Sequence, residues 1–285
     1  MEVGATIREY TVGQATVLDG FDASAMADGG RGQPLLPWPN RLADGQYEFD
    51  GQALQLPIDE LSRRNASHGL TRWLSWRVTN HQQHQVTLSH VIHPRPGYPF
   101  TLALEIEYAL SEMGLAVQTT AHNRGTRALP YGAGFHPYVT VGTPRIDHAL
   151  LKLPARSVLA VDERLIPTGD RRDVSGTELD FRTARVIAEQ RIDACFADLQ
   201  RDPDGRTRVE LCRQDSQRAV TLWMDDAFKY IQVFTGDTLA PHRRRQSIAI
   251  EPMTCPPNAF RSGVDLVRIE PEQRHTGGWG IFTTR

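Results

Sequence analysis

The chain has 285 residues, of which 40% are hydrophobic and 23% charged, a composition that supports a sizeable core and differs from that of disordered chains. Lysine and arginine total 32 while aspartate and glutamate total 34, so the formal net charge is −2. This balance argues against charge-driven binding to nucleic acids or anionic membranes.

The cysteine pattern and the hydropathy of the chain bear on its cellular compartment. Cys195, Cys212 and Cys255 are odd in number and lack CxxC spacing. This pattern predicts neither a disulfide framework nor a zinc site and favours a reducing compartment. No secretory signal is visible at the N-terminus, and no apolar run approaches the roughly 18 residues of a membrane helix. We therefore expect a cytoplasmic protein.

The clearest structural signal has a period of two residues and lies in Thr101–Leu110. Its even positions are large and apolar, whereas its odd positions are small or charged. Such alternation predicts a strand with one buried face, formed by Leu102, Leu104, Ile106, Tyr108 and Leu110. A turn at Glu112–Gly114 and a second strand at Leu115–Thr120 are expected to follow.

Strand patterns recur along the rest of the chain and are separated by turns, such as Asp202–Gly205. They cover Gln85–Ile92, Thr207–Cys212, Ala219–Met224, Tyr230–Phe234, Ser247–Glu251, Asp265–Ile269 and Trp279–Thr283. Only short stretches near Arg182–Gln190 are compatible with a helix. Because a parallel sheet needs crossover helices, the pattern predicts an all-β fold, a large antiparallel β-sandwich forming a single domain over residues 1–285.

Two segments in the first quarter of the chain are candidates for chemistry. Prolines in Pro34–Leu42 stiffen the backbone ahead of Arg41, whose fork of donors suits sugar hydroxyls or carboxylates. His68 precedes Gly69, where the backbone can bend sharply and expose the imidazole. A surface loop arginine and a structural histidine are the respective alternatives.

Two later segments carry a histidine and a glutamate. His136 follows two glycines, precedes Pro137 and has aromatic neighbours, which predicts an imidazole fixed in an aromatic-walled pocket or, alternatively, a structural role. Glu251 ends an apolar strand before a proline-rich turn. A desolvated glutamate has a raised pKa and can act as a general base. The alternative is a carboxylate that points outward into water.

Other motifs give weaker signals. The pairs His81/His84 and His90/His93 lie in or beside strand patterns, where positions i and i+3 face opposite sides, so we predict no metal site. The chain has no phosphate-cradling GxxxxGK loop, no GxGxxG after a strand and no GxSxG nucleophile elbow.

The segments taken together resemble the aldose 1-epimerase (mutarotase) family nearly from end to end. The matching motifs, in order, are Pro39–Leu42, Gly45–Gly51, His68-Gly69, Gly134–Tyr138, Ile146–His148, Val161–Gly169, Leu179–Arg182, Ile192-Asp193, Tyr230–Gly236 and Glu251. Each motif is weak alone, and their shared order is specific.

The resemblance implies a β-sandwich with a sugar cleft and no metal or cofactor. Glu251 matches the family's general base and His136 its general acid, while Arg41, His68 and Asp193 match residues that contact sugar hydroxyls and the reacting oxygens. The implied activity is interconversion of the α and β anomers of a hexose or hexose derivative by ring opening and closure. The aromatic residues Trp38, Trp73, Phe135 and Tyr138 are expected either to wall the cleft or to pack in the core.

Departures from the galactose-type pattern leave the sugar open. Leu70, Val139 and Ala194 replace residues common in those members, and the segment Glu251–Phe260 looks more like a shorter bacterial branch that includes a mutarotase associated with sulfoquinovose. Trp279–Ile281 points to the same branch.

Three alternative functions remain. A hexose-6-phosphate mutarotase would need a basic pocket, for which Arg72, Arg95 or Arg243–Arg245 are candidates. A non-catalytic sugar-binding or sensor protein is another, since a fold does not fix a function. A glycosidase using Asp193 and Glu251 is a third. The oligomeric state, monomer or homodimer, is left open.

Overall fold

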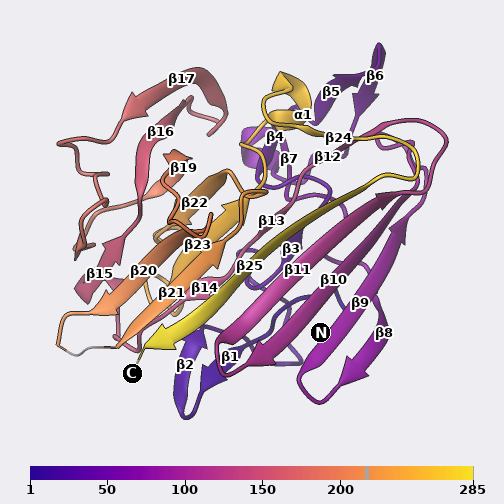
Figure 1. The fold of residues 1–285 in the computed structure, drawn as a ribbon. Helices are drawn as coiled ribbons and strands as arrows, with labels where there is room; N and C mark the ends of the chain where they lie inside the picture. The colour runs from indigo at the N-terminus through magenta and orange to yellow at the C-terminus, as the bar shows by residue number, and fades with distance from the viewer. Residues whose placement is uncertain (216–217, 285) are drawn as a thin grey trace.

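The computed structural model describes residues 1–215 and 218–284, and β-strands make up most of its regular structure (Figure 1). Paired strands run antiparallel in two large sheets and three small ones. The predicted all-β class and the antiparallel sheets are therefore confirmed. That residues 1–285 form one domain stays a prediction.

The first large sheet has ten strands within the described residues. Its order is β1 (Tyr10–Val12), β2 (Ala15–Leu18), β14 (Tyr138–Val139), β23 (Ile248–Met253), β22 (Tyr230–Phe234), β19 (Asp193–Leu199), β16 (Ala155–Val161) and β17 (Pro167–Asp173), with β3 (Pro34–Leu35) and β13 (Gly134–Phe135) pairing beside β23. Strands distant in sequence are adjacent here, so the sheet brings separate motifs together.

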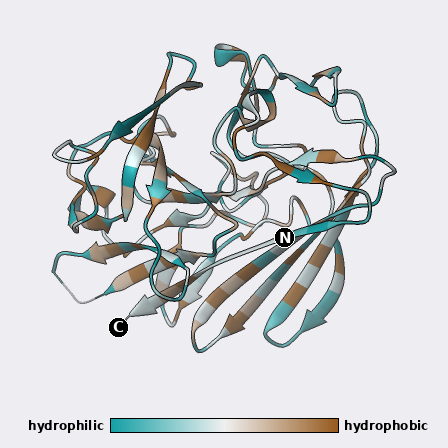
Figure 2. Cartoon of the chain, turned by 45° about the horizontal axis from the view of Figure 1, so that its top comes forward, coloured by the Kyte–Doolittle hydropathy of each residue, from teal (hydrophilic) through white to brown (hydrophobic). Residues whose placement is uncertain are grey.

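The second large sheet has nine strands in the same described part of the chain. Its order is β18 (Arg185–Val186), β15 (Ala149–Lys152), β20 (Thr207–Arg213), β21 (Ala219–Met224), β25 (Arg274–Thr284), β11 (Gly114–Asn123), β10 (Leu102–Ser111), β9 (Gln85–Ile92) and β8 (Arg77–Gln82). Its long strands lie side by side in Figure 1 and alternate in hydropathy in Figure 2.

The remaining elements are short. Two-stranded sheets are formed by β4 (Arg41–Ala43) with β7 (Asn65–Ser67), β5 (Gln46–Phe49) with β6 (Gln52–Gln55), and β12 (Leu129–Tyr131) with β24 (Val267–Ile269). The helical turns are η1 (Leu61–Arg63), η2 (Ile146–His148) and α1 (Ala259–Ser262). No helix in the described residues has the length and apolar character needed to cross a membrane.

The main core lies between the two large sheets. The ring of Phe135 on β13 lies 5.2 Å from that of Trp279 on β25, so side chains of both sheets meet there. Leu102, Leu104 and Ile106 are buried as their alternation predicts. This packing of inward-facing apolar residues from two sheets defines a sandwich.

Two local predictions are wrong. Leu110 is 48% exposed, because it lies at the end of the hairpin that turns at residues 112–113. The stretch Arg182–Gln190 contains strand β18 rather than a helix. The backbone N–H groups of Ile187 and Ala188 donate to the carbonyls of Ala149 and Asp147, so they are unavailable for helical bonds.

Candidate active site

The five predicted site residues line one cleft with a volume of about 530 Å³, hereafter the cleft. They are Arg41, His68, His136, Asp193 and Glu251. Asp193 and Glu251 come from β19 and β23, on either side of β22, whereas the other three come from β4, the turn after β7 and the turn after β13. The sheet thus forms the floor, and loops from the first half of the chain form the walls.

His136 and Glu251 form the centre of the cleft floor. Nε2 of His136 lies 3.3 Å from Oε1 of Glu251. Both residues are almost fully buried, so Glu251 does not point outward into water. Nδ1 of His136 and Oε2 of Glu251 have no hydrogen-bond partner in the described residues. Buried polar atoms are usually paired, so these two are exceptions within the described residues.

Burial changes the proton affinity of both groups. Desolvation, reinforced by the charge of Asp193 and opposed by Arg41, raises the pKa of the Glu251 carboxyl well above its usual range. Desolvation and the nearby cations Arg31 and Arg72 lower the pKa of His136 to about 3. Both shifts disfavour charge, so a neutral imidazole beside a neutral carboxylic acid is favoured over an ion pair.

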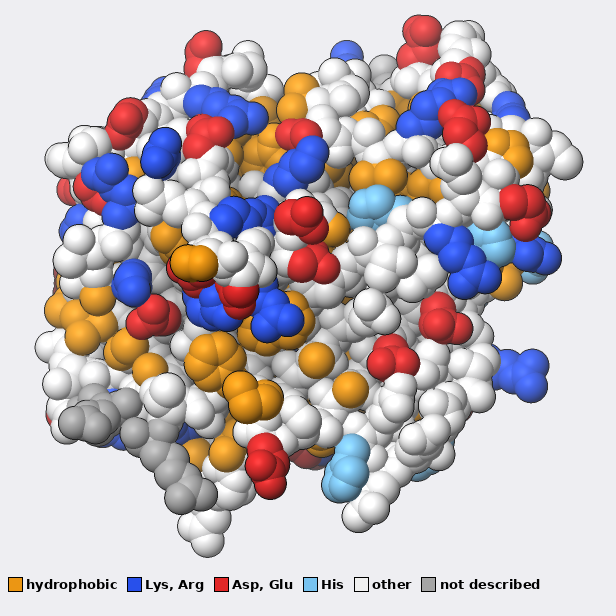
Figure 3. Space-filling view, viewed as in Figure 1, with side chains coloured by type: hydrophobic (Ala, Val, Ile, Leu, Met, Phe, Trp, Pro, Cys, Tyr) orange, Lys and Arg blue, Asp and Glu red, His pale blue; other side chains and the backbone are white. Residues whose placement is uncertain are grey.

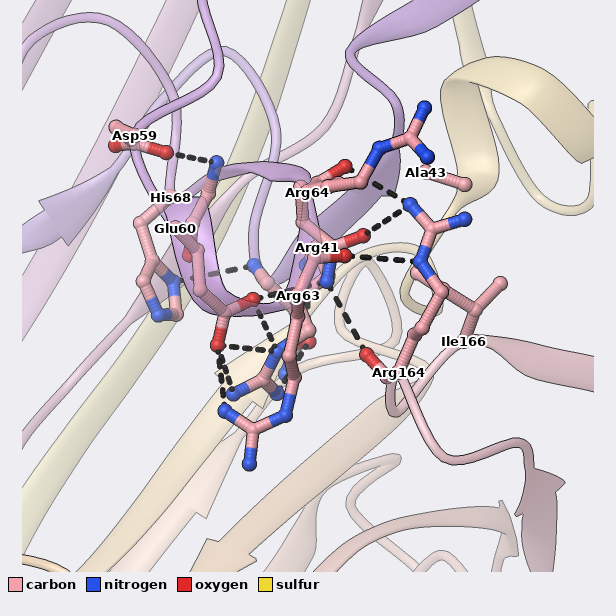
Figure 4. Close-up of polar contacts among 12 residues, drawn as sticks. Arg41, Ala43, Asp59, Glu60, Arg63, Arg64, His68, Arg164 and Ile166 are labelled. Atoms are coloured by element: carbon pink, nitrogen blue, oxygen red, sulfur yellow. Dashed lines mark hydrogen bonds and ion pairs between the residues drawn. The ribbon is translucent and has the colours of Figure 1, made fainter.

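Arg41 is fixed by a carboxylate that the sequence analysis missed. Nε of Arg41 donates to Oε2 of Glu60 at 2.9 Å, and Nη2 donates to Oε1 at 3.1 Å. Nη1 of Arg63 donates to the same carboxylate at 3.0 Å (Figure 4). Such a bidentate pair holds a guanidinium in one orientation. No sequence pattern singled out Glu60, because the pairing depends on how η1 packs beside β4.

His68 follows β7, the strand paired with β4, and is held there by the backbone of Asn40. Its φ angle is +61°, and that of Gly69 is +76°, which confirms the expected sharp bend. The backbone N–H of Asn40 donates to Nδ1 at 3.2 Å, so the neutral ring carries its proton on Nε2. Burial, followed by the charge of Arg72, lowers the pKa of His68 well below its usual value. The ring is therefore a neutral donor, edge-on to His136 at 5.6 Å.

Asp193 is oriented by Gln232, a second residue that the sequence analysis missed. Nε2 of Gln232 donates to Oδ1 of Asp193 at 2.6 Å, while Oε1 of Gln232 is buried without a partner. Asp193 stays open to solvent, yet desolvation by the surrounding protein raises the pKa of its carboxyl. The signal that could have identified Gln232 is a polar side chain inside the otherwise apolar strand Tyr230–Phe234.

The four predicted aromatic residues divide between cleft and core. Trp73 lines the cleft and is 49% exposed. Trp38 is buried against Phe260, and Phe135 is buried in the main core. Tyr138 lies behind the cleft floor, with its ring stacked on that of His136 at 5.0 Å.

The basic residues predicted for a phosphate do not converge. Arg72 lines the cleft but pairs with Asp59 at 3.1 Å. Arg243 pairs with Asp19 and Arg245 with Asp147 and Asp237, whereas Arg95 does not line the cleft. Arg244 lines an adjoining pocket that also contains Arg191. On the face seen in Figure 3, acidic and basic side chains are interspersed rather than gathered by sign.

Metal ligation has no candidate in the described part of the chain, where no group of three or more His, Cys, Asp or Glu side chains is arranged to hold an ion. The three cysteines are free, with Cys195 and Cys255 buried.

Comparisons with known proteins show which family the chain resembles. The family model described as aldose 1-epimerase matches residues 1–280. The chain is 37% identical to the uncharacterized protein YihR of Escherichia coli K12 over 284 residues, covering 99% of this chain and 89% of that protein. It is 25% identical to the aldose 1-epimerase of the same organism over 213 residues, covering 72% and 60%.

A solved structure shows the same fold. The GalM/aldose epimerase homologue from C. elegans superimposes with a TM-score of 0.87 at 17% identity, covering 100% of this chain and 94% of that one. The match of the family model over nearly the whole chain shows that this protein belongs to the aldose 1-epimerase family.

Proposed function

We propose that this protein is an aldose 1-epimerase that interconverts the anomers of a free hexose or a close hexose derivative. The proposal rests on one observation: the 3.3 Å contact between Nε2 of His136 and Oε1 of Glu251, both buried at the floor of a cleft. An acid and a base within hydrogen-bond reach of each other can serve two oxygens of one sugar ring.

In the proposed reaction, Glu251 accepts the proton of the anomeric hydroxyl while His136 donates a proton to the ring oxygen. The C1–O5 bond breaks as the C1=O1 bond forms, so an open-chain aldehyde results. Rotation about C1–C2 presents the other face of the carbonyl. The ring then closes with acid and base roles exchanged, which returns both protons and leaves the protein unchanged.

The electrostatics of the cleft favour the product of the ring-opening step over its starting state. Ring opening starts from imidazolium and carboxylate and ends with neutral imidazole and neutral carboxylic acid. The burial that disfavours charge on His136 and Glu251 therefore favours the state formed on ring opening. Proton transfer along their contact links this state to the ion pair when a sugar is bound.

The walls of the cleft supply the groups that orient the sugar. We propose that the fork of Arg41 and the Nε2–H of His68 donate to ring substituents, while Asp193 accepts from hydroxyls. Each of these groups is held by a second residue, namely Glu60, Asn40 and Gln232. Fixed donors and acceptors position a substrate without a further cost in side-chain ordering.

Two classes of hexose, neutral and anionic, are candidate substrates. A pocket lined by Arg191, Arg244 and Asp237 adjoins the cleft through Asp193, Phe234 and Thr238, and its two arginines make an anionic hexose such as a hexose 6-phosphate the second candidate. Anomer exchange at equilibrium, followed by NMR for glucose, galactose, sulfoquinovose and glucose 6-phosphate, distinguishes these substrates.

Each outcome of that panel is decisive. Exchange faster than in buffer for one sugar supports the proposal and names the substrate class. Line broadening of a bound sugar without faster exchange would instead support a binding or sensor protein. Hydrolysis of a glycoside by Asp193 and Glu251 would show up as a released sugar and would support a glycosidase. The cytoplasmic location stays a prediction.

A further inference from the structure

The imidazole of His136 is backed by two groups that the proposed chemistry does not use. The ring of Tyr138 stacks on it with centroids 5.0 Å apart and planes inclined by 15°. The guanidinium carbon of Arg31 lies 4.0 Å from the centroid of the same tyrosine ring. Arg31 and His136 thus contact one aromatic ring, which connects a permanent cation with the proposed acid.

Arg31 is one of the most deeply buried charges of the protein, with an exposed fraction of 1%. Its Nη1 donates to Asp19 at 2.8 Å and to Oγ of Ser247 at 3.4 Å, and its Nε donates to Asp28 at 3.0 Å. A buried guanidinium is costly unless it is paired. The surrounding residues therefore hold this cation in one place, beside Tyr138.

The loop that carries Arg31 also closes around His136. The hydroxyl of Tyr138 donates to the carbonyl of Gly29 at 3.0 Å. The backbone N–H of His136 donates to the carbonyl of Gln33 at 3.0 Å. Gly30 lies so close to the imidazole that a Cβ on it would be 2.7 Å from Cδ2 of His136. The ring is thus confined on the side of this loop.

We propose that Arg31 is a positioning residue for His136, acting through the Tyr138 ring and the loop of residues 28–33 to hold Nε2 toward Glu251 and to limit protonation of the pair. The proposal rests on the acid–base role given to His136 above. It assigns a part in the reaction to a residue that lies outside the cleft lining.

Charge arguments support this role. After burial, Arg31 is the strongest of the influences that lower the pKa of His136. Other ionisable groups also face this imidazole; they are Arg41 from β4, His68 and Arg72 from the segment after β7, and Glu251 from β23. Arg31 is almost completely shielded from water, whereas Arg41 and Arg72 are partly exposed. Charges interact more strongly in the protein interior than in water.

The test compares pH profiles of kcat/KM for wild type, Arg31→Met and Arg31→Lys, measured with an accelerated sugar from the panel. The active form of the His136–Glu251 pair holds one titratable proton, so activity falls at low pH and at high pH and the profile has two limbs. Loss of the Arg31 cation favours the protonated forms of both groups. We therefore expect both limbs for Arg31→Met to move to higher pH by roughly half a unit to one unit. Arg31→Lys keeps the charge, so both limbs of its pH profile should stay at the wild-type pH. The lysine lacks the guanidinium that holds the imidazole in place, so kcat of this variant should fall about tenfold.

A second variant makes the test independent of the fate of the buried arginine. Asp28 is a partly exposed partner of Arg31, and Asp28→Asn removes an anion, so its limbs should move to lower pH. Arg245→Met is the matched control: Arg245 is an equally buried, paired arginine elsewhere, and its loss should leave the limbs in place.

NMR titration of the His136 Cε1–H resonance, assigned with His136→Asn, gives a readout that needs no activity. The apparent pKa should rise in Arg31→Met and fall in Asp28→Asn. If Arg31→Met folds and neither its pH limbs nor its His136 titration moves, the inference is wrong. If Arg31→Met does not fold, unchanged pH limbs and an unchanged His136 titration in Asp28→Asn would overturn it. Absence of anomer exchange in wild type would refute the proposed function alone, because the titration still reports on Arg31.

Discussion

Gln232 and Glu251 lie directly opposite each other on β22 and β23, and each has a buried oxygen without a hydrogen-bond partner in the described residues. Buried acceptors are usually paired with donors. Sugar hydroxyls are donors of the right kind for both oxygens. The pair of residues therefore gives the floor of the cleft two acceptors suited to a polyol.

Glu251→Gln tests the proposed base. The amide keeps the size of the side chain but cannot accept the anomeric proton, so the rate of anomer exchange should fall about 10²–10⁴-fold with sugar affinity nearly unchanged. NMR exchange and ligand titration measure the two quantities. The control is Glu105→Gln on the exposed side of β10, which should behave as wild type. Full activity of Glu251→Gln would refute the assignment.

Replacing His136 should change how stability depends on pH. The pKa of His136 is lowered to about 3 in the folded protein, so the unfolded chain binds a proton near pH 6.5 that the folded chain does not. This group thus contributes stability above pH 6.5 that is lost as the pH falls toward 3.

His136→Asn should therefore lose less stability than wild type between pH 7 and pH 4.5, by roughly 2 kcal/mol. Urea unfolding at the two pH values measures the difference. His93→Asn, at an exposed histidine, serves as the control substitution. Equal losses in His136→Asn and wild type would show that His136 titrates normally.

Glu60→Gln tests the support of Arg41. The variant removes the carboxylate that accepts from Arg41 and Arg63, and the freed guanidinium no longer has one orientation. Because a bond to a charged group contributes about 1.5–3 kcal/mol, kcat/KM should fall roughly tenfold or more, mainly through KM. Glu48→Gln, on the exposed side of β5, is the control. A change confined to kcat would contradict an orienting role.

Gly69→Ala tests the turn that presents His68. Gly69 has a φ of +76°, and a Cβ there would lie 2.0 Å from the carbonyl oxygen of Leu36. Backbone strain and this clash should cost about 1–3 kcal/mol or more and lower activity by displacing His68. Gly51→Ala shares the positive φ without a close neighbour and should cost less. Thermal unfolding measures the loss of stability in each variant. Equal losses in the two variants would show that the clash with Leu36 does not destabilise the protein.

Much of the fold follows from local patterns. The strands with clear alternation, such as β9, β10 and β21, match their predicted ranges closely. The short strands β3, β13 and β14 lie in segments rich in glycine and proline and have no alternation to detect. They form because partners distant in sequence supply their hydrogen bonds, which no local pattern encodes.

For the candidate site, local sequence patterns identified the residue types: a histidine between glycines and a proline, and a glutamate in an apolar strand. The contacts came from tertiary packing: Nε2 of His136 lies beside Glu251, Gln232 donates to Asp193, Glu60 accepts from Arg41, and Arg31 lies over the ring of Tyr138. The reason is physical. Residue type sets what a group can do, whereas its partners, burial and proton affinity depend on which distant segments the two sheets bring into contact.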